Sequence, residues 1–260
     1  MANSAAVSSA SLDSVSVPVN LIKPILVDGW QRLQFAVLPP HCLLCGLPSD
    51  SGRDLCAGCA ADLMRNRVCC PRCALPLDAP APLCGECLQQ LPPFASAFVP
   101  LVYASPLDHL ETRFKFGRSL AAGRILSELM LDVMREAPPA LPQALIPVPL
   151  HDTRLRERGY NQALELAKPL ARALNIPLCS DALVRTRATA AQSELDADAR
   201  HRNLRGAFAV ASNATLPAHV AVFDDVMTTG TTLRECALTL LRAGVERVDV
   251  WALARAPKRR

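Results

Sequence analysis

The chain has 260 residues, of which half are hydrophobic and a fifth are charged, and its net charge is +4 at pH 7. This composition supports a buried core and excludes wholesale disorder, and the length allows one large domain or two smaller ones. The charge excess is too small to indicate nucleic-acid binding by itself. No apolar run reaches the roughly 18–20 residues that cross a bilayer, so we expect no membrane span.

The first 20 residues are rich in Ser, Ala and Val and carry one charged side chain, Asp13. They lack a basic start followed by an unbroken apolar stretch, so we expect no secretory signal and a cytoplasmic protein. Residues 1–38 are predicted to form a tail that contains at most one short helix, at 21–38.

The cysteines are concentrated in one segment, because nine of the eleven lie between Cys42 and Cys87. Eight of these form four Cys-x-x-Cys pairs, and each half of the segment repeats one pattern: a pair, ten residues and a second pair. Two such pairs supply four thiolates, the tetrahedral set that structural zinc takes. The sequence therefore predicts about two zinc ions, held by Cys42, Cys45, Cys56, Cys59, Cys70, Cys73, Cys84 and Cys87.

The spacing leaves two groupings of these cysteines open, sequential or interleaved, and we favour the sequential one. Disulfides are disfavoured in a chain without a secretory signal, and redox pairs usually occur singly beside a βαβ unit. Residues 39–93 have little periodic apolar pattern, so zinc would stabilise a double ribbon that lacks a core. With zinc and thiolates counted, the charge of this segment is about −5, which disfavours a broad grip on phosphates.

From residue 94 onward, apolar strands alternate with amphipathic helices. Apolar spacing predicts strands at 97–103, 144–148, 220–223 and 248–253, and helices at 107–116, 120–136, 162–174 and 232–243. Asn175 and Pro177 would end the third helix, and Gly244 would close the last one. The alternation predicts an α/β domain over 94–260, with a parallel sheet flanked by helices.

The last part of this domain contains the most informative stretch. An apolar strand at 220–223 runs into two carboxylates, Asp224 and Asp225, and a hydroxyl-rich loop and a helix follow. Backbone N–H groups at a helix N-terminus, with threonine hydroxyls beside them, suit a phosphate. The carboxylates can bind vicinal sugar hydroxyls, so the pattern fits a ribose 5-phosphate. Its phosphate would be held by Thr228, Thr229, Gly230, Thr231 and Thr232.

The alternative is a turn at the end of a strand in which a threonine caps the next helix. Threonine caps are common, but five consecutive hydroxyl or glycine positions after a pair of acids are not. The loop also lacks the Gly-Lys-Ser/Thr ending of a nucleotide P-loop, and the dinucleotide fingerprint is absent. A sugar-phosphate site is therefore the favoured interpretation.

This stretch resembles the phosphoribosyl diphosphate signature of type I phosphoribosyltransferases. The wider chain, from about residue 40 to the C-terminus, resembles the ComF family of competence-related proteins. Beside the cysteine pairs, the resemblance rests on short pieces in a fixed order: Lys115-Phe116-Gly117, Val148-Pro149-Leu150-His151, Arg154-Leu155-x-x-Arg158-Gly159-Tyr160-Asn161-Gln162, Gln192-x-x-Leu195 and residues 202–208.

The resemblance implies a type I phosphoribosyltransferase-like parallel sheet behind an N-terminal zinc-ribbon module with four-cysteine sites, in the cytoplasm. It implies binding of phosphoribosyl diphosphate with Mg²⁺, and a part in DNA uptake beside a helicase-like motor. By analogy, residues 149–154 would be a pyrophosphate loop and residues 187–206 a mobile hood. The pyrophosphate would be bound by Lys115, His151, Arg154 and Arg158.

Three functions follow from this resemblance. One is an enzyme that transfers ribosyl phosphate with loss of pyrophosphate, with Asp224 and Asp225 as its catalytic residues. The others are a non-catalytic uptake factor that binds single-stranded DNA, and a regulator that senses a nucleotide. No residue indicates an acceptor base, and an aromatic content of 4% counts against a base-stacking surface. We favour the enzyme.

Overall fold

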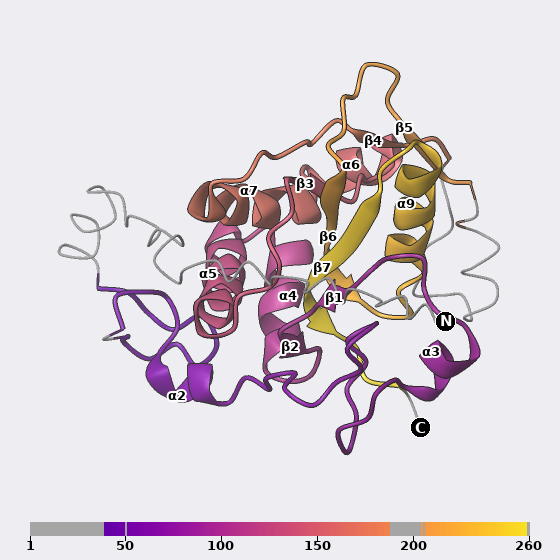
Figure 1. Cartoon of the computed structure of the whole chain (residues 1–260). Coiled ribbons are helices and arrows are strands. Elements are labelled where there is room, and N and C mark those ends of the chain that lie inside the picture. The colour runs from indigo at the N-terminus through magenta and orange to yellow at the C-terminus, as the bar shows by residue number, and fades with distance from the viewer. Residues whose placement is uncertain (1–38, 50, 188–203, 205, 259–260) are drawn as a thin grey trace, which may run out of the picture.

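The computed structural model describes residues 39–258, apart from 50, 188–203 and 205. The predicted tail and helix within residues 1–38, and most of the hood predicted at 187–206, lie outside the described residues. The described chain is a mixed α/β fold in which a parallel sheet is flanked by helices, as expected. The cysteine-rich ribbons lie below the sheet in the view of Figure 1.

The sheet has five strands, and every pairing in it is parallel. Its central strand, β7, pairs with two short strands on one side and with β6 on the other, and β3 follows β6. Most residues of the three longer strands are buried and apolar, as is usual for a parallel sheet covered on both faces. The strands are β1 (Ala97–Phe98), β2 (Leu101–Val102), β3 (Ala144–Pro147), β6 (His219–Met227) and β7 (Arg247–Arg255).

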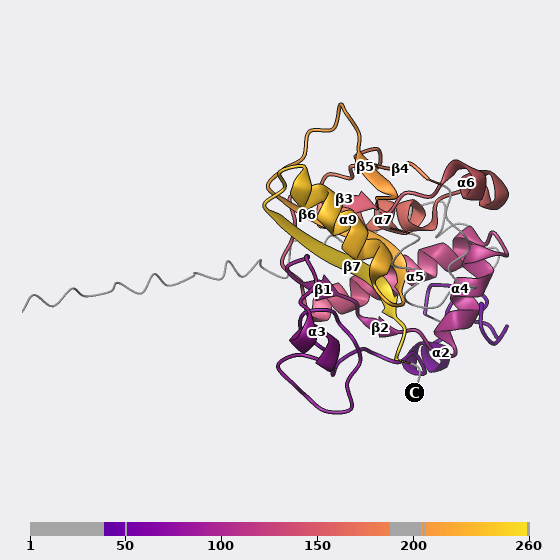
Figure 2. The ribbon, with the colours of Figure 1, turned by 90° about the vertical axis from the view of Figure 1, so that its right-hand side faces the viewer.

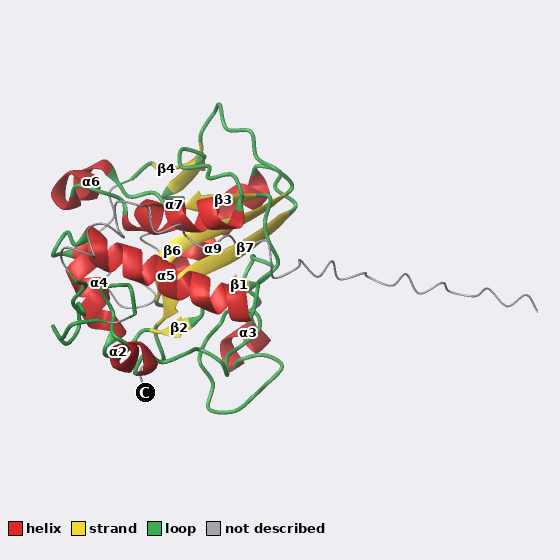
Figure 3. Ribbon diagram, turned by 90° about the vertical axis from the view of Figure 1, so that its left-hand side faces the viewer, coloured by secondary structure: helices red, strands yellow, loops and turns green. Residues whose placement is uncertain are grey.

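Helices cover both faces of the sheet, as Figures 2 and 3 show from opposite sides. Helices α5 (Leu120–Glu136) and α7 (Gln162–Leu174) cover one face, with α4 (Leu107–Lys115) packed beside α5. Helix α9 (Thr231–Arg242) covers the other face. Among the residues that the structure describes, no helix is both long and apolar enough to cross a membrane.

Two of the predicted helices begin and end at the predicted residues because their caps are strong. The Ser119 side chain accepts from the Ala122 N–H at the start of α5, and the Asn161 side chain accepts from the Leu164 N–H at the start of α7. Asn175 ends α7 in the left-handed conformation. Side-chain oxygens satisfy N–H groups that a helix N-terminus leaves unpaired, so such residues fix helix boundaries.

The strand predicted at 97–103 is instead two strands, β1 and β2, separated by Val99 and Pro100. Proline has no N–H to give to a ladder. Asn66, in the cysteine-rich ribbon segment (residues 39–93), binds both carbonyls at this break. Its N–H donates to Pro100 O (2.8 Å) and its Nδ2 donates to Val99 O (3.0 Å). Through these two hydrogen bonds, Asn66 joins the ribbon segment to the edge of the sheet.

The strand predicted to end at residue 223 continues to Met227. Its ladder with β7 persists beyond the apolar run, with Asp224 opposite Ala252 and Val226 opposite Ala254. The two acids therefore lie within the strand and not after it. The apolar pattern could not predict this extension, because polar residues also pair through their backbones and leave no apolar signal.

Besides the two short helices of the cysteine segment, three further elements were not predicted. Helix α6 (Asp152–Arg158) follows β3, so the loop expected at 149–154 is helical from Asp152 onward. Strands β4 (Leu183–Arg185) and β5 (Phe208–Val210) form an antiparallel pair beside α9. Each of the two strands has three residues, which is too few for apolar alternation to indicate a strand.

The ribbon segment packs on the sheet and its helices at both ends. In the first half, which contains α2 (Ala57–Ala61), Arg53 Nη1 lies 2.7 Å from Asp132 Oδ2 on α5. Arg124 on α5 lies 3.3 Å from Asp54. In the second half, which contains α3 (Gly85–Gln89), Arg72 donates to the carbonyl of Ala95 (2.5 Å), whose own N–H donates to the Val248 carbonyl of β7 (2.7 Å).

Candidate functional site

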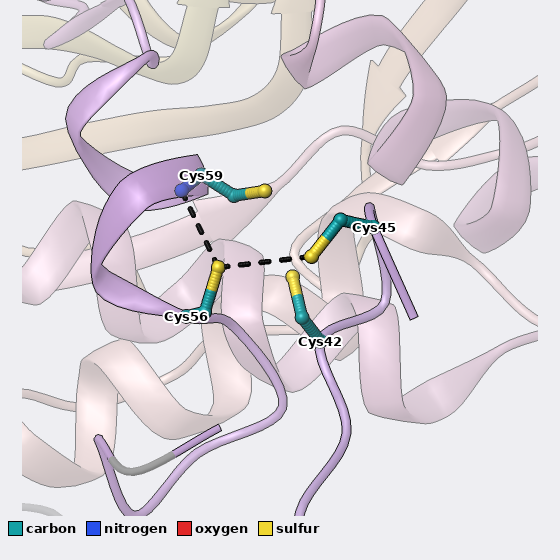
Figure 4. Close-up of side chains that lie close together, drawn as sticks. All are labelled: Cys42, Cys45, Cys56 and Cys59. Carbon is teal, nitrogen blue, oxygen red and sulfur yellow. Dashed lines mark hydrogen bonds between the residues drawn. The ribbon is translucent and has the colours of Figure 1, made fainter. Parts of the chain in front are cut away.

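The first cysteine cluster comes from a tight turn and from the start of α2. Figure 4 shows the sulfurs of Cys42, Cys45, Cys56 and Cys59 pointing toward one another, and all four lie within 4.8 Å. Cys45 Sγ is 3.8 Å from Cys56 Sγ. The Cys56 sulfur also caps α2, because it accepts from the Cys59 N–H at 3.5 Å.

The second cluster consists of Cys70, Cys73, Cys84 and Cys87, and all four residues are buried. Cys73 Sγ is 3.6 Å from Cys84 Sγ, and the Cys84 N–H donates to Cys70 Sγ at 3.3 Å. The structure thus groups the eight cysteines sequentially, and Cys69 belongs to neither cluster.

Both clusters have the chemistry of a closed zinc site. Four sulfurs about 2.3 Å from a zinc ion form a tetrahedron with edges of about 3.8 Å. The measured sulfur–sulfur distances of 3.8 and 3.6 Å agree with that geometry. Although burial opposes ionisation, backbone N–H groups lower the pKa of Cys42 to about 6 and that of Cys70 to about 7. Burial raises the pKa of Cys59 to about 12 and that of Cys73 to about 11, so the sulfur geometry carries the assignment. The two clusters therefore fit two structural zinc ions.

The predicted acid pair lies near the carboxyl end of β6. Neighbouring side chains on a strand point to opposite faces, so the two acids face different surroundings. Each carboxylate accepts from the following N–H: Asp224 from that of Asp225 (2.9 Å), and Asp225 from that of Val226 (2.6 Å).

Asp225 forms an ion pair with the last residue of α4. Lys115 Nζ lies 3.1 Å from Asp225 Oδ2 and 3.3 Å from Oε2 of Glu111, one helical turn earlier. Burial raises the pKa of the fully buried Glu111 to about 7, against the opposing effect of Lys115. Burial also disfavours the Lys115 charge, but Asp225 and Glu111 hold the pKa of Lys115 above its ordinary value.

Glu111 was not among the residues predicted from the sequence, although one signal was available. A glutamate four residues before a lysine is a common helical ion pair, and most such pairs are exposed. Only the fold reveals that Glu111 is buried and that its partner, Lys115, also pairs with Asp225.

Asp224 carries a raised pKa. Burial, and then the charge of Asp225, raise the pKa of Asp224 to about 8. Arg185 on β4 is coupled electrostatically to Asp224. Burial lowers the pKa of Arg185 below its ordinary value and Arg154 adds to this shift, whereas Cys236 and Asp224 oppose it. Arg185 was not selected from the sequence, because β4 was not recognised.

The threonine loop, Thr228–Thr232, joins β6 to α9 at the carboxyl edge of the sheet. Gly230 has a φ of 76°, and a Cβ there would lie 2.6 Å from Met227 Cε, so both conformation and space favour glycine. Thr229 Oγ1 lies 2.8 Å from Thr231 Oγ1. Thr231 and Thr232 are the first residues of α9, so all five residues predicted to bind phosphate form one turn at a helix N-terminus.

The residues expected to bind pyrophosphate are only partly brought together. Lys115 contacts Asp225, as described above. Arg154 and Arg158 lie on α6 and not in a loop, and the Arg158 guanidinium is 5.5 Å from the ring centroid of Phe116. His151 caps α6, because its Nδ1 accepts from the Thr153 N–H at 3.3 Å.

A residue outside every predicted motif fixes the first part of the loop. Arg255, at the end of β7, is 3% exposed and donates to the carbonyls of Met227 (3.0 Å) and Thr228. Its Nε donates to the carbonyl of Cys73 in the second cysteine cluster (3.2 Å). A charged residue at the end of an apolar strand was the only sequence signal for this role.

Comparison with known proteins agrees with the two cysteine clusters. A family model described as a double zinc ribbon domain matches residues 33–88, which include all eight clustered cysteines. DNA utilization protein YhgH of Escherichia coli (strain K12) is 38% identical over 226 residues, covering 84% of this chain and 98% of that protein. Competence protein F of Haemophilus influenzae is 39% identical over 208 residues, covering 78% and 90%. The chain belongs to the ComF family. The resemblance drawn from its motifs is thereby confirmed.

We expect the purified ComF-family protein to contain about two zinc ions per chain, and about one after Cys56→Ser or Cys84→Ser. Removing one of four thiolates opens a closed site, and each cluster supplies its own set. Atomic emission analysis of reduced protein measures the metal content. A preparation free of zinc that still folds cooperatively would contradict the assignment.

Proposed function

We propose that this protein binds phosphoribosyl diphosphate with Mg²⁺ at the carboxyl edge of β6, and that it transfers the ribosyl phosphate to an acceptor. The observation that carries the proposal is the continuous path from the acid pair, through the threonine loop, into the N-terminus of α9. Ligands of open parallel sheets bind outside the carboxyl ends of the strands, where this path lies.

Each part of the ligand has a matching part of the site. The 5-phosphate would accept hydrogen bonds from the threonine hydroxyls and N–H groups at the start of α9. The ribose hydroxyls would donate to Asp224 and Asp225. Lys115 and Arg154 would bind the pyrophosphate, with His151 and Arg158 at its outer side.

The acid pair suits a divalent cation. Asp225 already binds the Lys115 ammonium, and the raised pKa of Asp224 means that it readily holds a proton. Carboxylate oxygens are the donors that Mg²⁺ prefers. When bound, the ion would neutralise charge on the pyrophosphate as the bond from the anomeric carbon to the pyrophosphate oxygen breaks.

In the transfer, the anomeric carbon loses pyrophosphate and gains a bond to the acceptor. Positive charge develops on the sugar, and the carboxylates of the acid pair would stabilise it electrostatically. Lys115 and Arg154 would stabilise the negative charge of the leaving group. Glu111 would hold the Lys115 ammonium in place throughout.

We further propose a modular organisation and a cellular role. Residues 39–93 would form a zinc-ribbon module that docks partners, and residues 94–260 the sugar-phosphate module. The relatives are named for DNA utilization and for competence, which supports a role in DNA uptake. Single-stranded DNA and a helicase of the uptake machinery are then the expected partners.

Asp224→Asn combined with Asp225→Asn is expected to weaken phosphoribosyl diphosphate binding in Mg²⁺ by about tenfold or more, because charge-assisted hydrogen bonds to the ribose are lost. Isothermal calorimetry measures the affinity. The exposed pair Asp181→Asn with Glu246→Gln makes the same kind of substitution elsewhere and should bind normally. Unchanged affinity in the acid-pair variant would refute the ribose role, and binding without turnover of any acceptor would favour a sensor.

The Mg²⁺-dependent affinity should rise between pH 7 and pH 9, by at most about tenfold per pH unit for one released proton. Asp224, with a pKa of about 8, is largely protonated at pH 7, so a cation must displace that proton. Calorimetry in buffers of different ionisation enthalpy counts the released protons. The rise should vanish in Asp224→Asn, and a flat wild-type profile would contradict this account.

A second candidate function is direct binding of single-stranded DNA, and a surface beside the site favours it. Residues 113–120 and 151–158 together carry six Lys or Arg side chains and two acids, so their net charge equals the +4 of the whole chain. Phe116 is 71% exposed in this surface, with Arg158 over its ring. Basic side chains around an exposed aromatic ring are the usual combination for binding single strands.

On this second function, Phe116→Ala and Arg156→Ala should each weaken binding of a short single-stranded oligonucleotide. Loss of one stacked base predicts about fivefold or more for Phe116→Ala. Arg67→Ala, an exposed arginine in the ribbon segment, serves as the control. Fluorescence anisotropy over a salt series measures the affinity, and equal binding by all variants would remove this surface from consideration.

A further inference from the structure

The guanidinium of Arg255 links parts of the chain that are far apart in sequence. Its Nε donates to the Cys73 carbonyl, 182 residues earlier, at 3.2 Å. Its Nη1 donates to the carbonyls of Met227 (3.0 Å), Thr228 and Ala256 (3.2 Å). One planar group thus joins the turn of a cysteine cluster to the first residues of the threonine loop.

The burial of Arg255 makes this link strong. The residue is 3% exposed, and among the described residues it forms no ion pair with a carboxylate. A buried charge is costly unless hydrogen bonds and nearby opposite charge offset the loss of water.

The second cluster lies directly beside Arg255, because the Cys73 carbonyl accepts from its Nε at 3.2 Å. Four thiolates around one zinc ion carry a net charge of about −2, which complements a buried guanidinium. The first cluster lies in the other half of the ribbon segment, which contacts α5 through Arg53 and Arg124. Thus the second cluster contacts Arg255, which binds the start of the threonine loop, whereas the half that holds the first cluster contacts α5.

We propose that Arg255 is a positioning residue for the threonine loop, and that the second cysteine cluster, when it holds zinc, fixes Arg255 in place. The Cys73 carbonyl and the charge of the cluster hold one side of the guanidinium. The other side then holds the Met227 and Thr228 carbonyls, and so sets where the loop leaves β6. Metal in the second cluster thereby controls phosphate binding from a distance. The ligand assigned to the loop rests on the proposed function above, but the coupling does not.

The test begins with Arg255→Lys, which keeps the charge but cannot reach carbonyls on both sides. Amide hydrogen exchange of residues 228–233 in the ligand-free protein should become about tenfold faster or more, as expected for the loss of charge-assisted hydrogen bonds. Arg247→Lys, at the other end of β7 and partly exposed, is the matched control. Unchanged exchange in Arg255→Lys would overturn the proposal.

The metal arm compares Cys84→Ser with Cys56→Ser. We expect loss of zinc from the second cluster to speed exchange in the loop, and loss from the first cluster to leave it unchanged. Should Cys84→Ser fail to fold, Arg255→Lys still decides whether Arg255 positions the loop, and chelation of the remaining zinc from Cys56→Ser tests the coupling. Equal effects of the two cysteine variants would contradict selective coupling.

A ligand arm separates positioning from general loosening of the fold. Arg255→Lys should weaken calorimetric binding of ribose 5-phosphate by about tenfold or more, and leave binding of Mg²⁺-pyrophosphate unchanged, since pyrophosphate does not use the loop. Equal losses for both ligands would overturn the positioning role. If the wild type binds neither ligand, the proposed function fails, while the exchange measurements still test the coupling.

Discussion

The buried guanidinium of Arg255 is the constraint on which the arrangement of the site depends. It ends the central strand of the sheet, and its hydrogen bonds reach the second cysteine cluster on one side and the threonine loop on the other. A buried charge is stable only if its surroundings satisfy it completely, so ribbon, strand and loop must fit together. This fit shows physically how the cysteine-rich segment is fastened to the α/β sheet.

The same principle organises the charges at the carboxyl edge of β6. Lys115 lies between two carboxylates from different elements, Glu111 on α4 and Asp225 on β6. Asp224 faces a separate environment and has a raised pKa, so this edge holds more acid than base. The proposed function assigns a cation, and a ligand that brings one, to this edge. The arginines of α6 add positive charge beside it, where a longer anionic chain could follow.

Local signals in the sequence were sufficient for some elements and silent about others. The sequential cysteine pattern, helix α5 with Ser119 as its cap, and helix α7 with Asn161 as its cap could all be predicted from short-range chemistry. The extension of β6 through its acid pair could not, because pairing with β7 is a long-range contact. Glu111 and Arg255 were missed for a similar reason. Each looks like an ordinary charged residue until the fold buries it against partners distant in sequence.

The central claim has two parts. The acid pair, the threonine loop and the start of α9 together bind a phosphoribosyl group, and zinc in the second cysteine cluster holds the loop in place through Arg255. A crystal structure grown with phosphoribosyl diphosphate and Mg²⁺, with data collected at the zinc absorption edge, tests it most directly. The account predicts anomalous peaks in both cysteine clusters, the 5-phosphate on Thr228–Thr232 and the ribose hydroxyls on Asp224 and Asp225. Ligand bound elsewhere, or a loop that holds no phosphate at saturating ligand, would contradict it.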